Sequence, residues 1–227
     1  MTNLVISSGV WPTSWKLAKV VPVCNRNKPP TKLSSYRPIA LLSSISKIVE
    51  KVLYEQLSKF VESHGILPGN QHGFRKKPSI ESAIAITVTK AASAIEKGRN
   101  VSLAAYDFSA AFDTIDVKVF MFKISSWASE SGANLLVNYL SDGSQQVQWN
   151  GSMSLPKSLK YGVRRGSILD PLLFIIITAD LPRQCELDGV MSVLYADDTT
   201  ALVVTDSADQ SEIVIRVFSA RLVYYSA

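Results

Sequence analysis

The chain has 227 residues, of which 47% are hydrophobic, so it can bury the core of one large domain or two small ones and is not disordered. Its two cysteines, Cys24 and Cys185, lack the spacing of a zinc site, which predicts free thiols in a reducing compartment. The N-terminal residues do not resemble a leader, and the longest apolar run, 171–177, is too short to span a bilayer. We therefore expect a soluble intracellular protein of the cytoplasm or nucleus, with no membrane partner.

The net charge of +5 is unevenly distributed along the chain. Residues 1–99 contain 15 Lys and Arg and 5 Glu, a net charge of +10, whereas residues 100–227 contain 9 basic and 14 acidic residues, a net charge of −5. A basic part joined to an acidic part is expected when one part grips a polyanion and the other collects cations. The alternative is an uneven solvated surface that binds neither.

The basic part is predicted to contain one strand and two helices. Residues 16–23 have the composition of a strand, and a basic, Pro-rich loop over 25–38 follows. Apolar residues at helical spacing predict a helix over 46–65, and a second helical pattern runs from about 80 to 97. Each of these helices is followed or closed by a glycine, which is a common stop signal.

The acidic part alternates strands and helices. An apolar strand is expected to end at Asp107 and to be followed by a helix with Ser109 as its N-cap. A hairpin is predicted to turn at Asn150-Gly151, and a buried helix begins near Asp170. With a further hairpin over 193–204, this order predicts an α+β domain with helices packed on one face of an antiparallel sheet.

The last hairpin, "VLYADDTTALVV", carries two adjacent carboxylates, Asp197 and Asp198, where Asn-Gly or Asp-Gly is usual. Because adjacent negative charges repel, such a turn is favoured when a cation lies against it. If the strand that ends at Asp107 lies beside this hairpin, three carboxylates meet. Two divalent ions held by carboxylates stabilise in-line phosphoryl transfer, and Mg²⁺ prefers oxygen ligands. The alternative is a solvated acidic hairpin tip.

Five segments occur in order along the chain. They are "WPTSWKLAKVVPV", "SSYRPIALLSSISKIVEKVLYEQLSKFVESHGILPGNQHGFRKKPS", "AAYDFSAAFDTID", "YGVRRGSILDPLLFIIITADLP" and "YADDTTALVV". Through these segments nearly the whole chain resembles the reverse transcriptases of non-LTR retrotransposons, and within them the jockey-like insect elements. The resemblance implies a right-hand polymerase fold, with helical, basic fingers over residues 1–99 and a palm over residues 100–227. The family's thumb, primer grip and endonuclease are not recognised in the sequence, so we expect a truncated polymerase core.

The resemblance also implies catalytic residues. Asp107, Asp197 and Asp198 match the catalytic, metal-binding carboxylates of the palm, with Asp107 and Asp197 as the more direct ligands. The implied cofactor is a pair of Mg²⁺ ions, for which Mn²⁺ can substitute. Asp113 and Asp116 are interpreted as helix and turn residues instead.

Five residues match nucleotide-binding positions of the family. Phe112 matches the bulky gate that favours deoxynucleotides, although a core aromatic is the alternative. Tyr195 and Ala196 match positions beside the primer end. Arg37 matches the residue that grips the triphosphate, a task suited to its planar fork, and an exposed loop cation is the alternative. Arg165 lies in the expected nucleotide pocket.

Three consecutive cations, Arg75, Lys76 and Lys77, are expected to follow template or primer phosphates. A solvated loop is the alternative for this run. The partners implied are an RNA template, a DNA primer and deoxynucleoside triphosphates, with no obligate protein partner.

The chain departs from the family at the nucleotide pocket. Where Gly-Val-Pro-Gln-Gly-Ser is usual, the sequence is "GVRRGS", so Arg164 and Arg165 replace Pro and Gln. Arg165 lacks the amide acceptor of Gln and is longer, which disturbs positioning. Asp170 stands where Gly is usual, and His72 where Phe is usual. Two hypotheses follow: a reverse transcriptase that transfers nucleotides with two metal ions, or a catalytically inactive remnant that binds nucleic acid.

Overall fold

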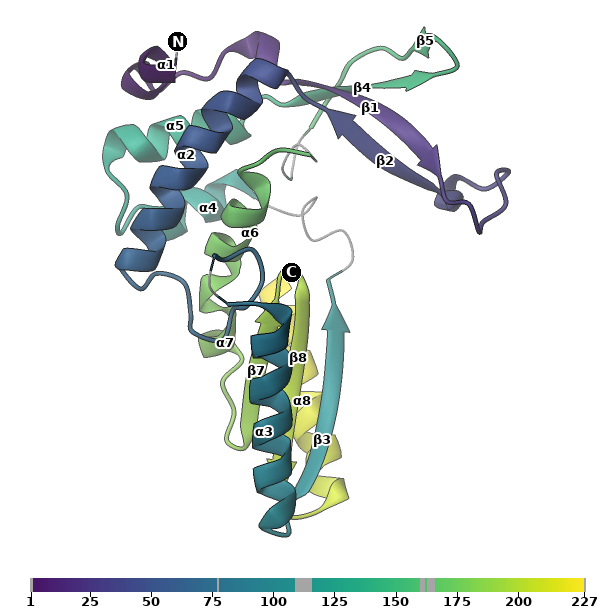
Figure 1. Ribbon diagram of the computed structural model, residues 1–227, viewed down its shortest axis with the longest axis vertical. Coiled ribbons are helices and arrows are strands. Elements are labelled where there is room, and N and C mark those ends of the chain that lie inside the picture. Colours follow the sequence, from purple (N-terminus) through teal and green to yellow (C-terminus); the bar gives the residue numbers. More distant parts are fainter. Residues whose placement is uncertain (1, 77, 109–115, 160–161, 163–165, 227) are drawn as a thin grey trace. The chain divides into compact units, whose positions relative to one another are not determined.

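The computed structural model of the chain describes residues 2–76, 78–108, 116–159, 162 and 166–226. The chain forms two compact units, each built from two separate stretches of sequence (Figure 1). The first unit comprises Met1–Leu57 and Phe112–Asp170, and the second comprises Ser58–Ala111 and Pro171–Ala227.

The first unit combines helices with a small mixed sheet. Its elements are α1 (Thr2–Ser8), η1 (Thr13–Trp15), β1 (Leu17–Cys24), η2 (Leu33–Ser35), β2 (Tyr36–Leu41), the larger part of α2 (Ser44–Ser63), α4 (Val117–Ile124), α5 (Glu130–Leu140), β4 (Ser144–Trp149), β5 (Ser152–Met153) and β6 (Lys157–Ser158). The strand order is β2-β1-β4-β5, with β6 beside β4. Strand β1 is antiparallel to β2 and parallel to β4.

Two local features explain parts of this unit. Asn150 and Gly151 have φ values of 47° and 81°, the two positive values that a type I′ hairpin turn between β4 and β5 requires. Trp11 is buried and lies edge-on to Trp15 and Tyr139, with ring centroids 5.4 and 4.8 Å away. Edge-to-face packing of this kind is favourable for aromatic rings and ties the N-terminal segment to α5.

The second unit is a three-stranded antiparallel sheet with helices. Its elements are α3 (Ile80–Glu96), β3 (Asn100–Asp107), α6 (Asp170–Ile177, from its second residue), η4 (Thr178–Asp180), α7 (Leu181–Gln184), β7 (Val190–Tyr195), β8 (Asp198–Thr205) and α8 (Ala208–Ser226). The strand order is β3-β8-β7, so β8 is central.

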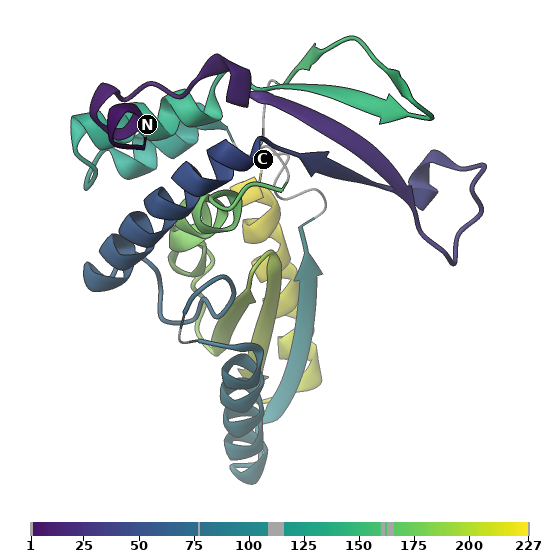
Figure 2. The ribbon, with the colours of Figure 1, turned by 45° about the horizontal axis from the view of Figure 1, so that its top comes forward.

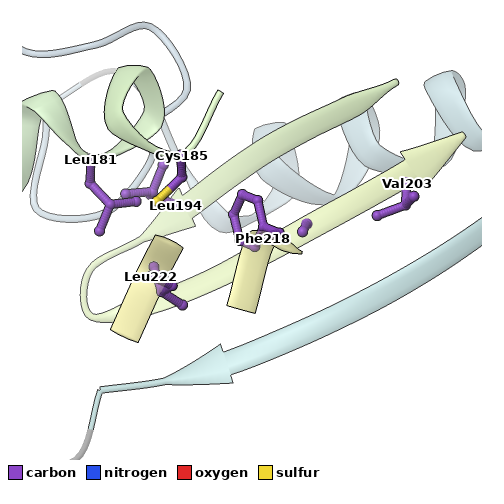
Figure 3. Close-up of a cluster of buried hydrophobic side chains, with 7 residues drawn as sticks. Leu181, Cys185, Leu194, Val203, Phe218 and Leu222 are labelled. Atoms are coloured by element: carbon purple, nitrogen blue, oxygen red, sulfur yellow. The ribbon is translucent and has the colours of Figure 1, made fainter. Parts of the chain in front are cut away.

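The sheet of the second unit is covered on both faces, with α3 and α8 on opposite sides (Figures 1 and 2). Phe218 and Leu222 of α8 pack against Leu194 of β7 and Val203 of β8 (Figure 3). Because side chains alternate along a strand, the neighbouring residue Leu202 points to the opposite face, where it is also buried. Each fully buried Leu or Phe contributes roughly 1.5–3 kcal/mol of transfer free energy, so this sheet is firmly held.

The structure confirms the α+β class and most of the predicted elements. The strands and helices predicted over 16–23, 46–65 and 80–97 lie within two residues of β1, α2 and α3. Strand β2 was not predicted, and its first three residues were assigned to the basic loop over 25–38; α8 was not predicted either. Helices were expected on one face of the sheet only, whereas the structure has α8 on one face and α3 on the other (Figures 1 and 2).

The two compact units are a different division of the chain from the expected fingers over residues 1–99 and palm over residues 100–227, which stays a prediction. Helix α3 contacts all three strands of the β3-β8-β7 sheet and so belongs with it. Residues 112–170 belong with β1 and β2, because β4 pairs with β1. No helix in the part of the chain that the structure describes is long and apolar enough to cross a membrane.

Candidate active site

Two of the predicted catalytic carboxylates lie directly opposite each other on neighbouring strands. Asp107 is the last residue of β3, Asp198 is the first residue of β8, and the register pairs them. Directly opposite residues of an antiparallel pair share a face, with Cβ atoms about 4.5–5.5 Å apart. Tyr195 pairs with Asp198 from the other side and therefore lies on the same face. This end of the sheet is the candidate active site.

The turn between β7 and β8 consists of Ala196 and Asp197, so the two adjacent aspartates do not share it. Asp198 is already part of β8. Ala196 has a φ of 59°, a conformation that Gly adopts freely but that strains Ala by on the order of 1–3 kcal/mol. Two-residue turns that begin with a positive φ suit the twist of a hairpin, which explains why the chain turns one residue earlier than the sequence suggested.

The donor chemistry of this end of the sheet suits a divalent cation. Like charges directly opposite each other destabilise a sheet, yet Asp107 and Asp198 are opposite and exposed. Within the described residues, no Lys, Arg or His forms an ion pair with either carboxylate or with Asp197. Carboxylate oxygens are the ligands that Mg²⁺ prefers.

These carboxylates are nevertheless not assembled into a closed cage. Among the residues that the structure describes, no three His, Cys, Asp or Glu side chains lie close enough together to hold a metal ion. The structure thus provides two facing carboxylates, Asp107 and Asp198, and a third, Asp197, in the adjoining turn.

A loop that sequence reasoning had treated as a cation-bearing segment runs along this hairpin. The backbone N–H of His72 donates to the Leu194 carbonyl at 2.7 Å, and the Leu194 N–H donates to the Asn70 carbonyl at 2.9 Å. The side chain of Asn70 donates to the Ser192 carbonyl at 2.9 Å. Residues 70–72 therefore extend the sheet beside β7, with Gln71 in a parallel bridge to Leu194.

The same loop reaches the strained turn. The Gln71 side-chain oxygen accepts hydrogen bonds from the N–H groups of Gly73 and Ala196, at 2.8 and 3.2 Å, and its nitrogen lies 3.4 Å from the Ala196 carbonyl. A Cβ on Gly73 would lie 2.0 Å from the nitrogen of Ala196, so only Gly fits there. Sequence reasoning missed Gln71 and Gly73. The one local signal was Gly73, because a glycine outside any recognised turn can mark a close approach of another backbone segment.

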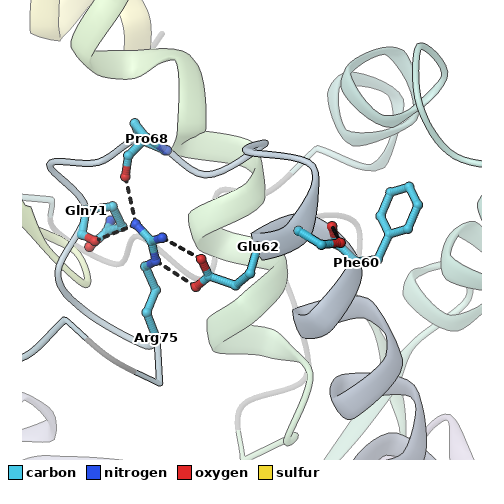
Figure 4. A network of polar contacts seen from close by, with 6 residues as sticks. Phe60, Glu62, Pro68, Gln71 and Arg75 are labelled. Carbon is cyan, nitrogen blue, oxygen red and sulfur yellow. Dashed lines mark hydrogen bonds and ion pairs between the residues drawn. The ribbon is translucent and has the colours of Figure 1, made fainter.

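The side chain of Arg75 bonds to the loop itself and to Glu62 of α2 (Figure 4). Its Nε donates to Glu62 Oε1 at 2.8 Å, its Nη2 pairs with Glu62 Oε2, and its Nη1 donates to the carbonyls of Pro68 and Gln71 at 2.8 and 3.2 Å. Four of its five N–H donors are thereby engaged, and its side chain is only 12% exposed. The structure thus gives Arg75 a role in shaping the loop, and its expected contact with nucleic-acid phosphates stays a prediction. Lys76 is exposed.

His72, which departs from the family's Phe, is accommodated in the interior of this loop. Its ring Nδ1 lies 2.7 Å from Ser82 Oγ on α3, and the residue is buried. Burial, together with the nearby charge of Arg75, holds the pKa of His72 below its ordinary value. The imidazole is therefore held in its neutral form at neutral pH.

The remaining predicted residues fall into two groups. Arg37 lies on β2 in the first unit, exposed and opposite Val23, and Asp170 begins α6, where it accepts a hydrogen bond from Tyr139 at 3.2 Å. Asp116 caps α4 by accepting from the Lys118 N–H at 2.7 Å, in agreement with its interpretation as a helix residue. The residues that lie outside the described part of the chain are Lys77, Ser109, Phe112, Asp113, Arg164 and Arg165.

The chain matches the family described as "Reverse transcriptase (RNA-dependent DNA polymerase)" over residues 26–226. It belongs to the reverse transcriptase family. The resemblance inferred from the five ordered segments is thereby confirmed, and with it the assignment, by family, to the nucleotidyltransferases.

Curated relatives of the chain include proteins of Drosophila mobile elements. The chain is 28% identical over 214 residues to the "Probable RNA-directed DNA polymerase from transposon BS" of Drosophila melanogaster, covering 92% of this chain and 24% of that protein. It is 28% identical to the "RNA-directed DNA polymerase from mobile element jockey" of the same species, covering 90% and 23%. The chain thus spans about a quarter of the length of these relatives.

Among solved structures, the chain is similar to the apo telomerase of Candida tropicalis truncated from its C-terminal domain. The TM-score is 0.63 at 12% sequence identity, and the match covers 100% of this chain and 52% of that one. At this identity the likeness concerns the fold, and it confirms the right-hand polymerase architecture.

Proposed function

We propose that this chain carries the nucleotidyl-transfer centre of an RNA-directed DNA polymerase of a non-LTR retrotransposon. The observation that carries the proposal is the pairing of Asp107 with Asp198 at the end of the sheet, next to a turn that contains Asp197. The substrates would be deoxynucleoside triphosphates, with an RNA template and a DNA primer.

Asp107, Asp197 and Asp198 are the residues that would hold the two Mg²⁺ ions. When bound, such ions stabilise the attacking and leaving oxygens of an in-line phosphoryl transfer. Tyr195, on the same face as Asp198, and Ala196 in the turn would lie beside the primer end. Phe112 and Arg165 are proposed to contact the incoming nucleotide.

Phosphate binding would fall to exposed cations in both units. Arg37 on β2 is exposed, and so are the cations of the loop before it, Arg26, Lys28 and Lys32. In the second unit Lys76 is exposed, and Lys77 follows it in the sequence. Lys and Arg that neutralise phosphates release counterions, so binding would weaken steeply as salt increases. We propose that the basic residues 1–99 act as the fingers and residues 100–227 as the palm.

A second candidate is a nucleic-acid-binding domain without catalysis. It is favoured by Arg164 and Arg165, which stand where the resemblance implies Pro and Gln in the nucleotide pocket. Misplacing reacting groups by about 1 Å can cost on the order of 100-fold in rate. We therefore expect slow extension at most.

Primer extension tests the two candidates. The chain is incubated with a homopolymer RNA template, a DNA primer and Mg²⁺ or Mn²⁺, beside its Asp197→Asn form and the control Asp209→Asn, an exposed residue of α8. Extension that only Asp197→Asn abolishes supports the polymerase. Salt-dependent template binding without extension supports the second candidate, and extension that survives Asp197→Asn contradicts the assigned carboxylates.

A further inference from the structure

The turn that carries Asp197 needs an external restraint. Ala196 has a φ of 59°, which an L-residue with a Cβ adopts reluctantly. Left alone, a two-residue turn with Ala at this position would relax toward a conformation of lower energy, and the side chain that follows it would move. A carboxylate that must point to a fixed place therefore requires a contact that holds the backbone of Ala196.

The side-chain amide of Gln71 supplies that contact. Its oxygen accepts from the N–H of Ala196 at 3.2 Å, and its nitrogen donates to the carbonyl of Ala196 at 3.4 Å. The N–H belongs to the peptide group before Ala196, and the carbonyl belongs to the peptide group after it. One amide thus holds both peptide groups whose rotation sets the backbone conformation of Ala196.

The amide itself is held firmly. Gln71 is 1% exposed, and its oxygen also accepts from the Gly73 N–H at 2.8 Å, which fixes the orientation of the amide group. On either side of Gln71, the backbone groups of Asn70 and His72 are hydrogen-bonded to Leu194 in β7. The restraint is therefore anchored to the same strand that leads into the turn.

We propose that Gln71 is a positioning residue for Asp197: it keeps the turn in its strained form and so holds Asp197 beside the facing pair Asp107 and Asp198. This inference rests on the proposed metal-dependent function. Gln71 is not proposed to touch the nucleotide or the primer. It acts through the backbone of Ala196, as residues behind a metal ligand commonly do.

The test measures metal binding and the turn separately, without polymerisation. Gln71→Met keeps the length of the side chain and removes the amide, and the matched control is Gln56→Met at an exposed position of α2. Binding of Mn²⁺ alone is measured by titration, with the free ion followed by its electron paramagnetic resonance signal. The binding that Asp197→Asn removes is assigned to the proposed site. Hydrogen exchange at the Ala196 amide, followed by NMR, reports the hydrogen bond to Gln71.

We expect Gln71→Met to weaken Mn²⁺ binding by roughly 10- to 100-fold, the usual cost of losing a group that orients a metal ligand. Exchange at Ala196 should accelerate in the same variant, and Gln56→Met should change neither quantity. Adding Ala196→Gly to Gln71→Met should recover most of the lost affinity, because Gly adopts the positive φ without strain. A residue that only stabilised the fold would not be rescued in this way.

Four outcomes would overturn the inference. Wild-type Mn²⁺ affinity in Gln71→Met, or a double variant no better than the single one, would show that Gln71 does not act through the strained turn. If Gln71→Met does not fold, Mn²⁺ affinity is compared between Ala196→Gly and the double variant. A large loss of affinity in the double variant would contradict the strain argument, because Gly at position 196 should not need the amide. If the wild-type chain shows no Asp197-dependent Mn²⁺ binding, the proposed metal site is wrong, and so is the proposal that Gln71 positions one of its ligands. Hydrogen exchange at the Ala196 amide separates this result from failure of the restraint, because it reports the Gln71 hydrogen bond without metal.

Discussion

Two antiparallel hairpins carry predicted site residues, and they are supported very differently. Strands β7 and β8 pair six residues and lead to Asp198, and strands β1 and β2 also pair six residues and present Arg37. The β7–β8 hairpin lies between buried side chains on both faces. The β1–β2 hairpin has a cluster of only three small buried residues, and its Ile39 and Leu41 are 47% and 49% exposed.

The difference corresponds to the chemistry proposed for each hairpin. Carboxylates that share metal ions with a reacting phosphate must be held within about 0.5 Å, which requires a packed and hydrogen-bonded backbone. Cations that bind phosphates act through charge over longer distances, so the strand that presents Arg37 needs less support. Loss of packing should therefore harm the β7–β8 hairpin more than the β1–β2 hairpin.

The first prediction concerns the cores beneath the two hairpins. Phe218→Ala, which empties a fully buried site against β7 and β8, should lower the free energy of unfolding by about 3–5 kcal/mol. Val20→Ala on β1 removes far less buried area and should cost roughly 1–2 kcal/mol. Denaturant unfolding followed by circular dichroism measures both. Equal losses would mean that the hairpins are equally supported.

The second prediction concerns the close approach of the loop to the turn. Gly73→Ala places a methyl group against backbone atoms of Ala196, which no side-chain rotation can relieve. Overpacking of this kind costs about 1–3 kcal/mol, and we expect loss of Asp197-dependent Mn²⁺ binding as well. Gly69→Ala is the matched control, because no atom lies within 4 Å of its added Cβ and its φ is not positive. If Gly73→Ala behaves like Gly69→Ala, the loop does not press on the turn.

The contrast between these glycines also shows what the sequence could and could not predict. Apolar periodicity predicted β8 and the end of β3 at Asp107, because burial of a strand leaves its pattern in that strand's own residues. The contacts of Gln71 and Gly73 with Ala196 join residues more than 120 positions apart, and no local pattern encodes them. For the same reason no local pattern predicts the ion pair of Arg75 with Glu62, which lies in another element, α2. The turn lies at Ala196 and Asp197, one residue earlier than expected, because the geometry of a two-residue hairpin fixes the register of its strands.

The third prediction separates two arginines that the sequence treated alike as phosphate ligands. Arg37→Ala should leave the unfolding free energy nearly unchanged and should weaken RNA and DNA binding, lowering the slope of log affinity against log salt by about 0.7–0.9 if it contacts one phosphate. Arg75→Ala should instead destabilise the second unit by roughly 1–3 kcal/mol, because it removes the hydrogen bonds that Arg75 donates to Glu62 and to two backbone carbonyls. Binding titrations at several salt concentrations and unfolding curves distinguish the two. Equal effects on both measurements would contradict the roles that the structure gives them.

The smallest expected effect is a pH dependence of the loop behind the turn. Burial and the charge of Arg75 lower the pKa of His72 in the folded chain, whereas in the unfolded chain it titrates near its ordinary value of about 6.5. Above that value both states are neutral and stability is complete. As the pH falls below it, the unfolded chain binds the proton more readily, so stability decreases.

His72→Phe removes this titration and restores the residue usual in the family. Unfolding at pH 8 should change little, because the variant loses the contact with Ser82 Oγ but also the buried Nε2, which has no partner among the described residues. Between pH 8 and pH 5.5, the free energy of unfolding should fall more for the wild type than for the variant. The control is Gln56→Met, a change at an exposed, non-titratable position of α2 that should leave the pH dependence unaltered. If wild type and His72→Phe lose stability in parallel as the pH falls, His72 is not the group that makes this loop sensitive to acid.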